Sequence, residues 1–218
     1  MTITSIYEQY QIMPSLQLHM LRVAAVARVI ALNTPGLGEV SEITAACLLH
    51  DMGNILKFKL DLFPDFLQPQ GLEYWEGVKR DFVGKYGTDE HVATHEIARE
   101  LNQPTRVMDL LSAIGFSKAL ENAVHSDTAK KICAYSDHRV TPFGVTSLEE
   151  RMQEGRSRFA LNKNTQEDPQ KFEQLARGMQ RIEQQIFSVC TIKPSDITDQ
   201  LVNPVVEELR EFEMNQKS

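Results

Sequence analysis

Two adjacent residues, His50 and Asp51, are the first candidates for chemistry because they follow an apolar helical stretch that ends near a glycine. Ser41 is the expected N-cap of this helix, and Gly53 is the expected left-handed residue that ends it. Asp51 then lies beside the free carbonyl groups of the helix C-terminus, whose partial negative charge disfavours an acid by about 1 kcal/mol or less. A bound cation would reverse this effect. The alternative is a solvated Asp51 after a core helix.

A third and a fourth candidate ligand lie on other helices. Residues 14–32 have apolar side chains at helical spacing, and His19 falls inside the apolar stripe. A buried imidazole needs a polar partner, so His19 is either a hydrogen-bonded core residue or a ligand. Asp137 falls in the last turn of a helix expected over residues 120–139, where the helix dipole again favours a cation.

His91 and His95 are four residues apart and share one face of a helix whose expected N-cap is Thr88. Many metal sites use this spacing. The core stripe of that helix, which contains Ala93 and Ile97, lies about half a turn away. An exposed pair is therefore the alternative to ligation, and His95 is the stronger candidate of the two.

The composition restricts the class of protein. With 218 residues, 42% of them hydrophobic and 7% aromatic, the chain is long enough for one helix-rich domain with an appendage. The net charge of −7 disfavours a polynucleotide partner. Three cysteines without a pattern, no visible secretory signal and no apolar run near the roughly 20 residues of a membrane span favour a cytoplasmic protein with no membrane partner.

The C-terminal part of the chain reads as a helical appendage. Ser147 and Glu150 form a capping box that begins one helix, and residues 162–168 form a polar link. A long amphipathic helix over residues 169–190 and a last helix near residues 205–212 have apolar stripes. Such stripes are ordinarily core or a subunit contact, so a homodimer is one expectation.

Taken in chain order, the four candidate ligands resemble those of the HD superfamily of metal-dependent phosphohydrolases. Proteins of that superfamily have a first histidine, an adjacent His-Asp pair and a distal aspartate inside an all-helical bundle. In this chain the matching residues are His19, His50, Asp51 and Asp137.

Three segments support the resemblance, which extends over about residues 16–145. His-Asp-Met-Gly-Asn at residues 50–54 is similar to the family's His-Asp-Ile-Gly-Lys, although Asn54 replaces the lysine. Residues 94–98 resemble the helix after the pair, and residues 132–140 resemble the segment with the last aspartate.

The resemblance implies an all-α fold with an HD-like bundle over residues 1–145. A helical C-terminal extension over residues 146–218 would pack on this bundle or on a partner subunit. Two imidazoles and two carboxylates suit one divalent transition metal per chain (Mn²⁺, Fe²⁺, Co²⁺, Ni²⁺ or Zn²⁺) better than calcium. A second arrangement, with two metal ions, would recruit His95 and His125 as ligands or as residues behind the ligands.

The implied activity is hydrolysis of a phosphomonoester or phosphodiester of a small, nucleotide-like molecule by a metal-bound hydroxide, with Asp51 as the catalytic residue that orients the water. Arg139, Lys57 and Arg22 are the expected substrate-binding cations, each of which is otherwise a solvated charge. Two alternatives remain open. One is a non-catalytic HD-type regulatory protein that binds a nucleotide or metal, and the other is a diiron oxygenase on the same bundle.

Overall fold

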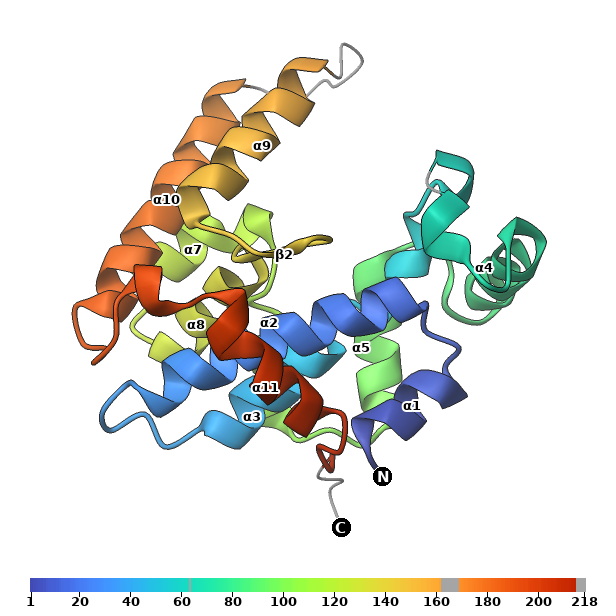
Figure 1. The fold of residues 1–218 in the computed structure, drawn as a ribbon, viewed down its shortest axis with the longest axis horizontal. Helices are drawn as coiled ribbons and strands as arrows, with labels where there is room; N and C mark the ends of the chain where they lie inside the picture. Colours follow the sequence, from blue (N-terminus) through green and yellow to red (C-terminus); the bar gives the residue numbers. More distant parts are fainter. Residues whose placement is uncertain (63, 162–168, 215–218) are drawn as a thin grey trace.

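The computed structural model describes residues 1–62, 64–161 and 169–214, and Figure 1 shows that they are built mainly from helices. About 70% of the chain is helical, which confirms the predicted all-α fold. The α-helices of the described residues are α1 (Ile3–Gln9), α2 (Pro14–Leu32), α3 (Val40–Leu49), α4 (Leu72–Tyr86), α5 (Glu90–Glu100), α6 (Thr105–Leu111), α7 (Ala119–Val124), α8 (Thr128–Asp137), α9 (Leu148–Leu161), α10 (Pro169–Phe187) and α11 (Asp199–Leu209).

Shorter elements complete the described fold. One antiparallel hairpin pairs β1 (Val140–Thr141) with β2 (Gly144–Val145) between α8 and α9. The stretch between α3 and α4 contains short 3₁₀ turns. The 3₁₀ helices of the described residues are η1 (Asn54–Leu56), η2 (Leu60–Leu62), η3 (Pro64–Leu67), η4 (Phe116–Lys118) and η5 (Pro194–Asp196).

α2 is the central helix of the bundle, and it packs against α3, α8 and α11 (Figure 1). Its side chains at residues 23–27 are all fully buried, so neighbouring elements cover every face of the helix there. By length and composition α2 could also cross a membrane, which corrects the expectation that no segment approaches that size. A core helix passes the same test, and 61% of the apolar stretch of α2 is buried inside the protein.

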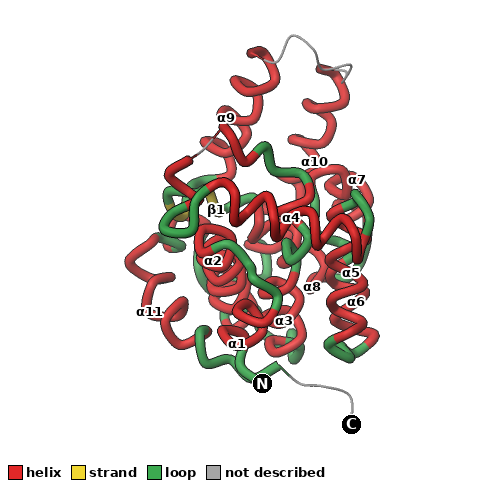
Figure 2. The backbone as a smooth tube through the Cα atoms, turned by 90° about the vertical axis from the view of Figure 1, so that its right-hand side faces the viewer, coloured by secondary structure: helices red, strands yellow, loops and turns green. Residues whose placement is uncertain are grey.

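The two ends of the described chain lie side by side. Ile3 N–H donates to the Phe212 carbonyl at 2.9 Å, and Thr2 forms an antiparallel bridge with Glu213. α11 packs against α2, and α10 packs against α7 and α8, so the C-terminal helices contact the rest of the bundle. Figure 2 shows α9 and α10 projecting beyond it. The domain boundary at residue 145 stays a prediction, and the polar link at residues 162–168 lies outside the described residues.

Two of the predicted helix starts are wrong by one or two residues. α3 begins at Val40 after Glu39, so Ser41 lies inside the helix and does not cap it. α5 is capped by Asp89, whose carboxylate accepts hydrogen bonds from the N–H groups of His91 and Val92 at 2.9 Å, in place of the expected Thr88. The capping box of α9 is confirmed, because Ser147 and Glu150 each accept a hydrogen bond from the other's backbone N–H.

The single helix expected over residues 120–139 is two helices, α7 and α8. Asp127 separates them because its carboxylate caps α8, accepting from the N–H groups of Ala129 and Lys130 at 2.9 and 3.3 Å. The Arg106 guanidinium holds the Asp127 side chain in place with two hydrogen bonds of 2.7 and 3.1 Å. Residues 125–128 at the break are all polar, and the apolar pattern resumes after them at Ala129.

Gly53 is needed for a reason other than the one the sequence suggested. Its φ is −90°, so it is not in the left-handed region. A Cβ at this position would lie 2.3 Å from the Glu90 carbonyl oxygen and 2.8 Å from the Ala93 Cβ. Glycine is therefore required because α5 packs directly against the turn that follows α3.

Arg139 joins α8 to the elements that follow it, and only 3% of the residue is exposed. Its guanidinium donates to the Thr146 carbonyl, to the Tyr135 hydroxyl at 2.6 Å, and to the Pro194 and Ile197 carbonyls at 3.2 Å. A planar group with five donors suits this set of acceptors. Arg139 therefore ties the hairpin and the segment before α11 to α8.

Gly53→Ala should lower the free energy of unfolding by about 1–3 kcal/mol, because the added methyl group overlaps backbone atoms of α5 that cannot easily move. Urea unfolding measures this. Gly84→Ala in α4 is the matched control, since nothing lies within 4 Å of its added Cβ and alanine favours a helix by up to about 1 kcal/mol. Equal unfolding midpoints for Gly53→Ala and the wild type would contradict the packing argument.

Arg139→Gln should destabilise the protein by about 3 kcal/mol or more, because buried carbonyl groups lose charged donors and find no water. The control is Arg210→Gln in an exposed i, i+3 ion pair with Glu207, where the expected change is about 0.5 kcal/mol or less. Thermal unfolding compares the two variants. A similar small effect for both would show that the Arg139 contacts contribute little.

Candidate metal centre

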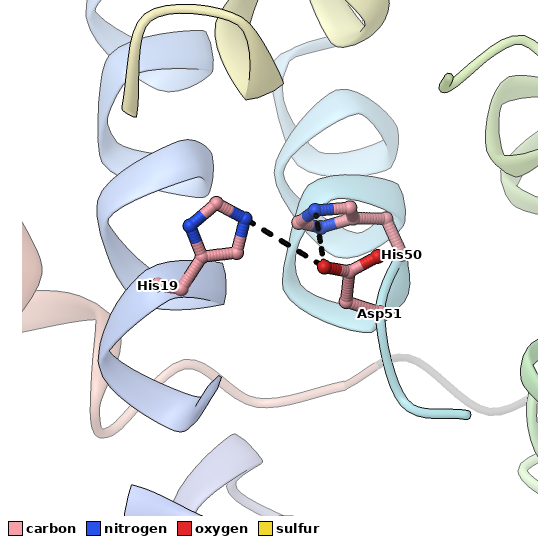
Figure 3. A group of neighbouring side chains, drawn as sticks. All are labelled: His19, His50 and Asp51. Atoms are coloured by element: carbon pink, nitrogen blue, oxygen red, sulfur yellow. Dashed lines mark ion pairs between the residues drawn. The ribbon is translucent and has the colours of Figure 1, made fainter. Parts of the chain in front are cut away.

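Side chains from three helices converge at one point of the bundle. His19 comes from the first half of α2, His50 and Asp51 follow directly after α3, and Asp137 is the last residue of α8. Figure 3 shows His19, His50 and Asp51 facing one another across the gap between α2 and α3. These helices lie side by side in the bundle, so residues that are distant in sequence share one site.

The distances between the polar atoms are those of a compact cluster. His19 Nε2 lies 3.7 Å from Asp51 Oδ2 and 3.3 Å from Asp137 Oδ1. His50 Nε2 lies 3.6 Å and 3.4 Å from the same two oxygens. One ligand atom each of His19, His50 and Asp51 lies within 4.8 Å of the others, as a common metal ion requires.

His50 and Asp51 can face one point because α3 has ended before them. Residues next to each other on a helix diverge by about 100°, so the pair can share an ion only off the helix end or along its edge. α3 ends at Leu49, and the following turn is held by the Gly53 N–H, which donates to Thr94 Oγ1 of α5 at 3.0 Å. This contact gives residue 94 a role in positioning the pair.

The orientation of the His50 ring leaves one nitrogen directed at the cluster. Its Nδ1–H donates to the Cys47 carbonyl at 2.7 Å, which places the lone pair of the neutral ring on Nε2. The side chain is only 2% exposed, and Nε2 is buried without a hydrogen-bond partner in the described structure. A buried, unpaired imidazole nitrogen costs free energy, and a metal ion would remove that cost.

The electrostatics of the cluster favour a positive charge between the carboxylates. Burial alone would lower the pKa of His50, but Asp51 and Asp137 raise it to about 9. Burial alone would raise the pKa of Asp137, but its contacts with His19 and His50 hold that pKa well below its usual range. Asp137 therefore stays ionised, and either a proton or a metal cation balances its charge.

The structure does not bring His95 or His125 into this cluster. His95 follows Thr94 on α5 and lines a shallow surface pocket of about 720 Å³ together with His91. His125 is exposed, and its Nδ1 accepts a hydrogen bond from Asp127 N–H at 3.0 Å. It precedes α8, whereas Asp137 ends that helix, and ten helical residues span about 15 Å.

The three predicted substrate-binding cations have different surroundings. Arg139 is buried and its guanidinium is occupied by the fold, so the structure corrects the prediction that it contacts substrate. Lys57 is half exposed, with Nζ 4.0 Å from Glu90 Oε1. Arg22 lies one turn after His19, donates from Nη1 to the Pro142 carbonyl at 3.3 Å, and has a buried Nε without a hydrogen-bond partner.

Two residues beside the cluster were not singled out from the sequence. The buried His138 ring donates from Nδ1 to the Ala134 carbonyl at 3.0 Å and lies 3.9 Å from Asp137 Oδ2. Burial is the main cause that lowers the pKa of His138, and the nearby positive charge of Arg151 on α9 lowers it further. Only the position next to Asp137 signalled His138 in the sequence, and nothing signalled Arg151.

Comparison with known proteins agrees with this geometry. A family model described as the HD domain matches residues 17–153, a segment that contains all four residues of the cluster. No curated protein matches the chain, and no solved structure matches it. The matched segment covers more than half of the chain, and HD domains are typically metal-dependent phosphohydrolases. This protein therefore belongs to the HD domain family.

Proposed function

We propose that this protein is a metal-dependent phosphohydrolase that cleaves a phosphomonoester or phosphodiester of a small, nucleotide-like molecule. The observation that supports it is the convergence of His19, His50 and Asp51, with Asp137 within 3.4 Å of both imidazoles. Family membership adds that such a cluster in an HD domain typically serves phosphate-ester chemistry.

The donor set fits a divalent transition metal. Two imidazole nitrogens and two carboxylates suit Mn²⁺, Fe²⁺, Co²⁺, Ni²⁺ or Zn²⁺. The unpaired Nε2 of His50 fits this assignment, since its other nitrogen is fixed by the Cys47 carbonyl. We propose one ion per chain, because His95 and His125 lie away from the cluster. The two-metal arrangement and the diiron alternative both need more ligands than gather here among the described residues.

The residues divide the chemistry between them. The bound metal would supply a Lewis acid for a phosphate oxygen and would make water a nucleophile near neutral pH. Asp51 would orient that water, as its place in the His-Asp pair implies. Arg22 and Lys57 would bind the phosphate, because Arg22 lies one turn after His19 and Lys57 follows the His-Asp turn.

The wider expectations remain proposals. A small phosphorylated substrate suits the acidic chain, whose net charge of −7 disfavours a polynucleotide. We retain a cytoplasmic location, no membrane partner and a homodimer among these proposals. The alternative function is that of a non-catalytic regulatory protein with the same bundle.

Asp51→Asn and Asp137→Asn should each lower metal affinity at least ten-fold, because each change removes a negatively charged ligand. Purified variants are titrated with Mn²⁺ and Zn²⁺, and retained metal is measured by elemental analysis. The matched control is His91→Ala, an exposed histidine on α5 that should change metal content little. His95→Ala separates the two arrangements, since a loss of half the metal would indicate a second ion.

Wild-type protein loaded with each of the five metals should hydrolyse at least one compound of a broad phosphomonoester and phosphodiester panel. A chelator and Asp51→Asn should each abolish the turnover. Tight binding of a phosphorylated compound without turnover under any metal would favour the regulatory alternative.

In the same assay, Arg22→Ala should raise KM about 10- to 100-fold, as expected for a charged hydrogen bond to phosphate worth about 1.5–3 kcal/mol. Arg28→Ala is the control, because Arg28 lies on the same helix but faces Glu208 of α11 at 4.0 Å. Equal KM values for the two variants would exclude Arg22 from the phosphate site.

A further inference from the structure

The β1–β2 hairpin begins three residues after Asp137 and ends where α9 is about to start. Val140 pairs with Val145, and Thr141 pairs with Gly144, so Pro142 and Phe143 form the tip. The yellow arrow in Figure 1 shows this hairpin lying over α2. β1 also packs against α2, the helix that contains His19.

Several contacts fix the hairpin. Phe143 N–H donates to Thr141 Oγ1 at 3.2 Å, inside the turn. Val145 N–H donates to Asp199 Oδ1 of α11 at 3.0 Å, and the same carboxylate approaches Gly144, whose φ of +141° suits glycine. Val140 is fully buried. The hairpin tip is therefore held in one place by its base.

The hairpin tip contacts an arginine that lies one turn after His19 on α2. The Pro142 carbonyl accepts a hydrogen bond from Arg22 Nη1 at 3.3 Å. Arg22 is three residues after His19 on α2, and side chains at this spacing are neighbours, with Cβ atoms about 5–6 Å apart. Phe143 thus follows a residue that touches the proposed phosphate-binding arginine.

Phe143 is the most exposed large hydrophobic residue of the described chain, with 89% of its surface accessible. An aromatic ring on a fixed hairpin can bind another ring with little loss of conformational freedom. The neighbouring Arg22 would direct a phosphate group to the metal cluster, so the organic part of the same molecule would extend toward the tip.

We infer that Phe143 determines substrate specificity by stacking on the flat ring of the phosphate ester, most simply a nucleobase. This inference rests on the proposed phosphohydrolase function. It names the residue that would recognise the organic part of the phosphate ester. Aromatic side chains stack on any base through its face, so Phe143 provides preference for a ring without reading which base is present. Arg22 supplies the adjacent positive charge.

Binding of two phosphonates to metal-loaded protein tests the inference without turnover. One is the phosphonate analogue of adenosine monophosphate, in which carbon replaces the ester oxygen. The other is methylphosphonate, which has no ring. Calorimetry should show that Phe143→Ala weakens binding of the adenosine analogue about ten-fold or more, as expected for loss of a base stack. Binding of methylphosphonate should change less than about two-fold.

Phe143→Trp should bind the adenosine analogue within about three-fold of the wild type, which a merely structural role would not require. The control is Val124→Ala, which also shortens an exposed apolar side chain (74% exposed). Val124 ends α7, and the whole of α8 separates it in the chain from Asp137. This substitution should affect binding of neither ligand. Because the side chains of Phe143 and Val124 are mostly exposed to solvent, the melting temperatures of all variants should match that of the wild type.

Two results would overturn the inference. One is equal binding of the adenosine analogue to the wild type and Phe143→Ala. The other is a change from dimer to monomer in sedimentation of Phe143→Ala with unchanged affinity, which would make the tip a subunit contact. Phe143-dependent binding in a protein without hydrolytic activity would instead overturn only the proposed function, so the two failures are distinguishable.

Discussion

Two carboxylates and two imidazoles share one partly buried space, and the free energy of this site depends on how their charge is balanced. His19 and His50 each lie 3.3–3.7 Å from oxygens of Asp51 and Asp137. Ionised carboxylates that lose water need a positive partner, and neutral imidazole nitrogens need a donor or a metal. A divalent cation would meet both needs at once, so the cluster is a possible metal site.

Helix ends strengthen that preference. Asp51 follows the C-terminus of α3, and Asp137 ends α8, so both acids lie where helix dipoles contribute negative potential. α2 provides His19 from a helix that its neighbours surround over residues 23–27. The cluster therefore combines two negative helix ends with a residue of the buried central helix, and three of its side chains already lie within 4.8 Å of one another.

Arginines near the cluster have separate structural and chemical roles. Arg139 is buried and donates to carbonyl groups that join α8, the hairpin and the segment before α11. Arg22 contacts the hairpin through one nitrogen and keeps a buried, unpaired Nε. Arg139 thus holds the base of the hairpin, and Arg22 contacts the Pro142 carbonyl at its tip. A positive charge close in sequence to a ligand is therefore weak evidence of contact with substrate.

The sequence by itself determined the all-α class and the limits of α2 through helical periodicity, and it indicated the four cluster residues through their resemblance to the HD pattern. Tertiary structure decided the break at Asp127, the packing need for Gly53, the burial of Arg139 and the distance of His125 from the cluster. The packing at Gly53 and the burial of Arg139 depend on contacts between segments far apart in the chain, and the break at Asp127 combines a local cap with a contact to the distant Arg106. No spacing within one helix records such contacts, so only the folded protein shows them.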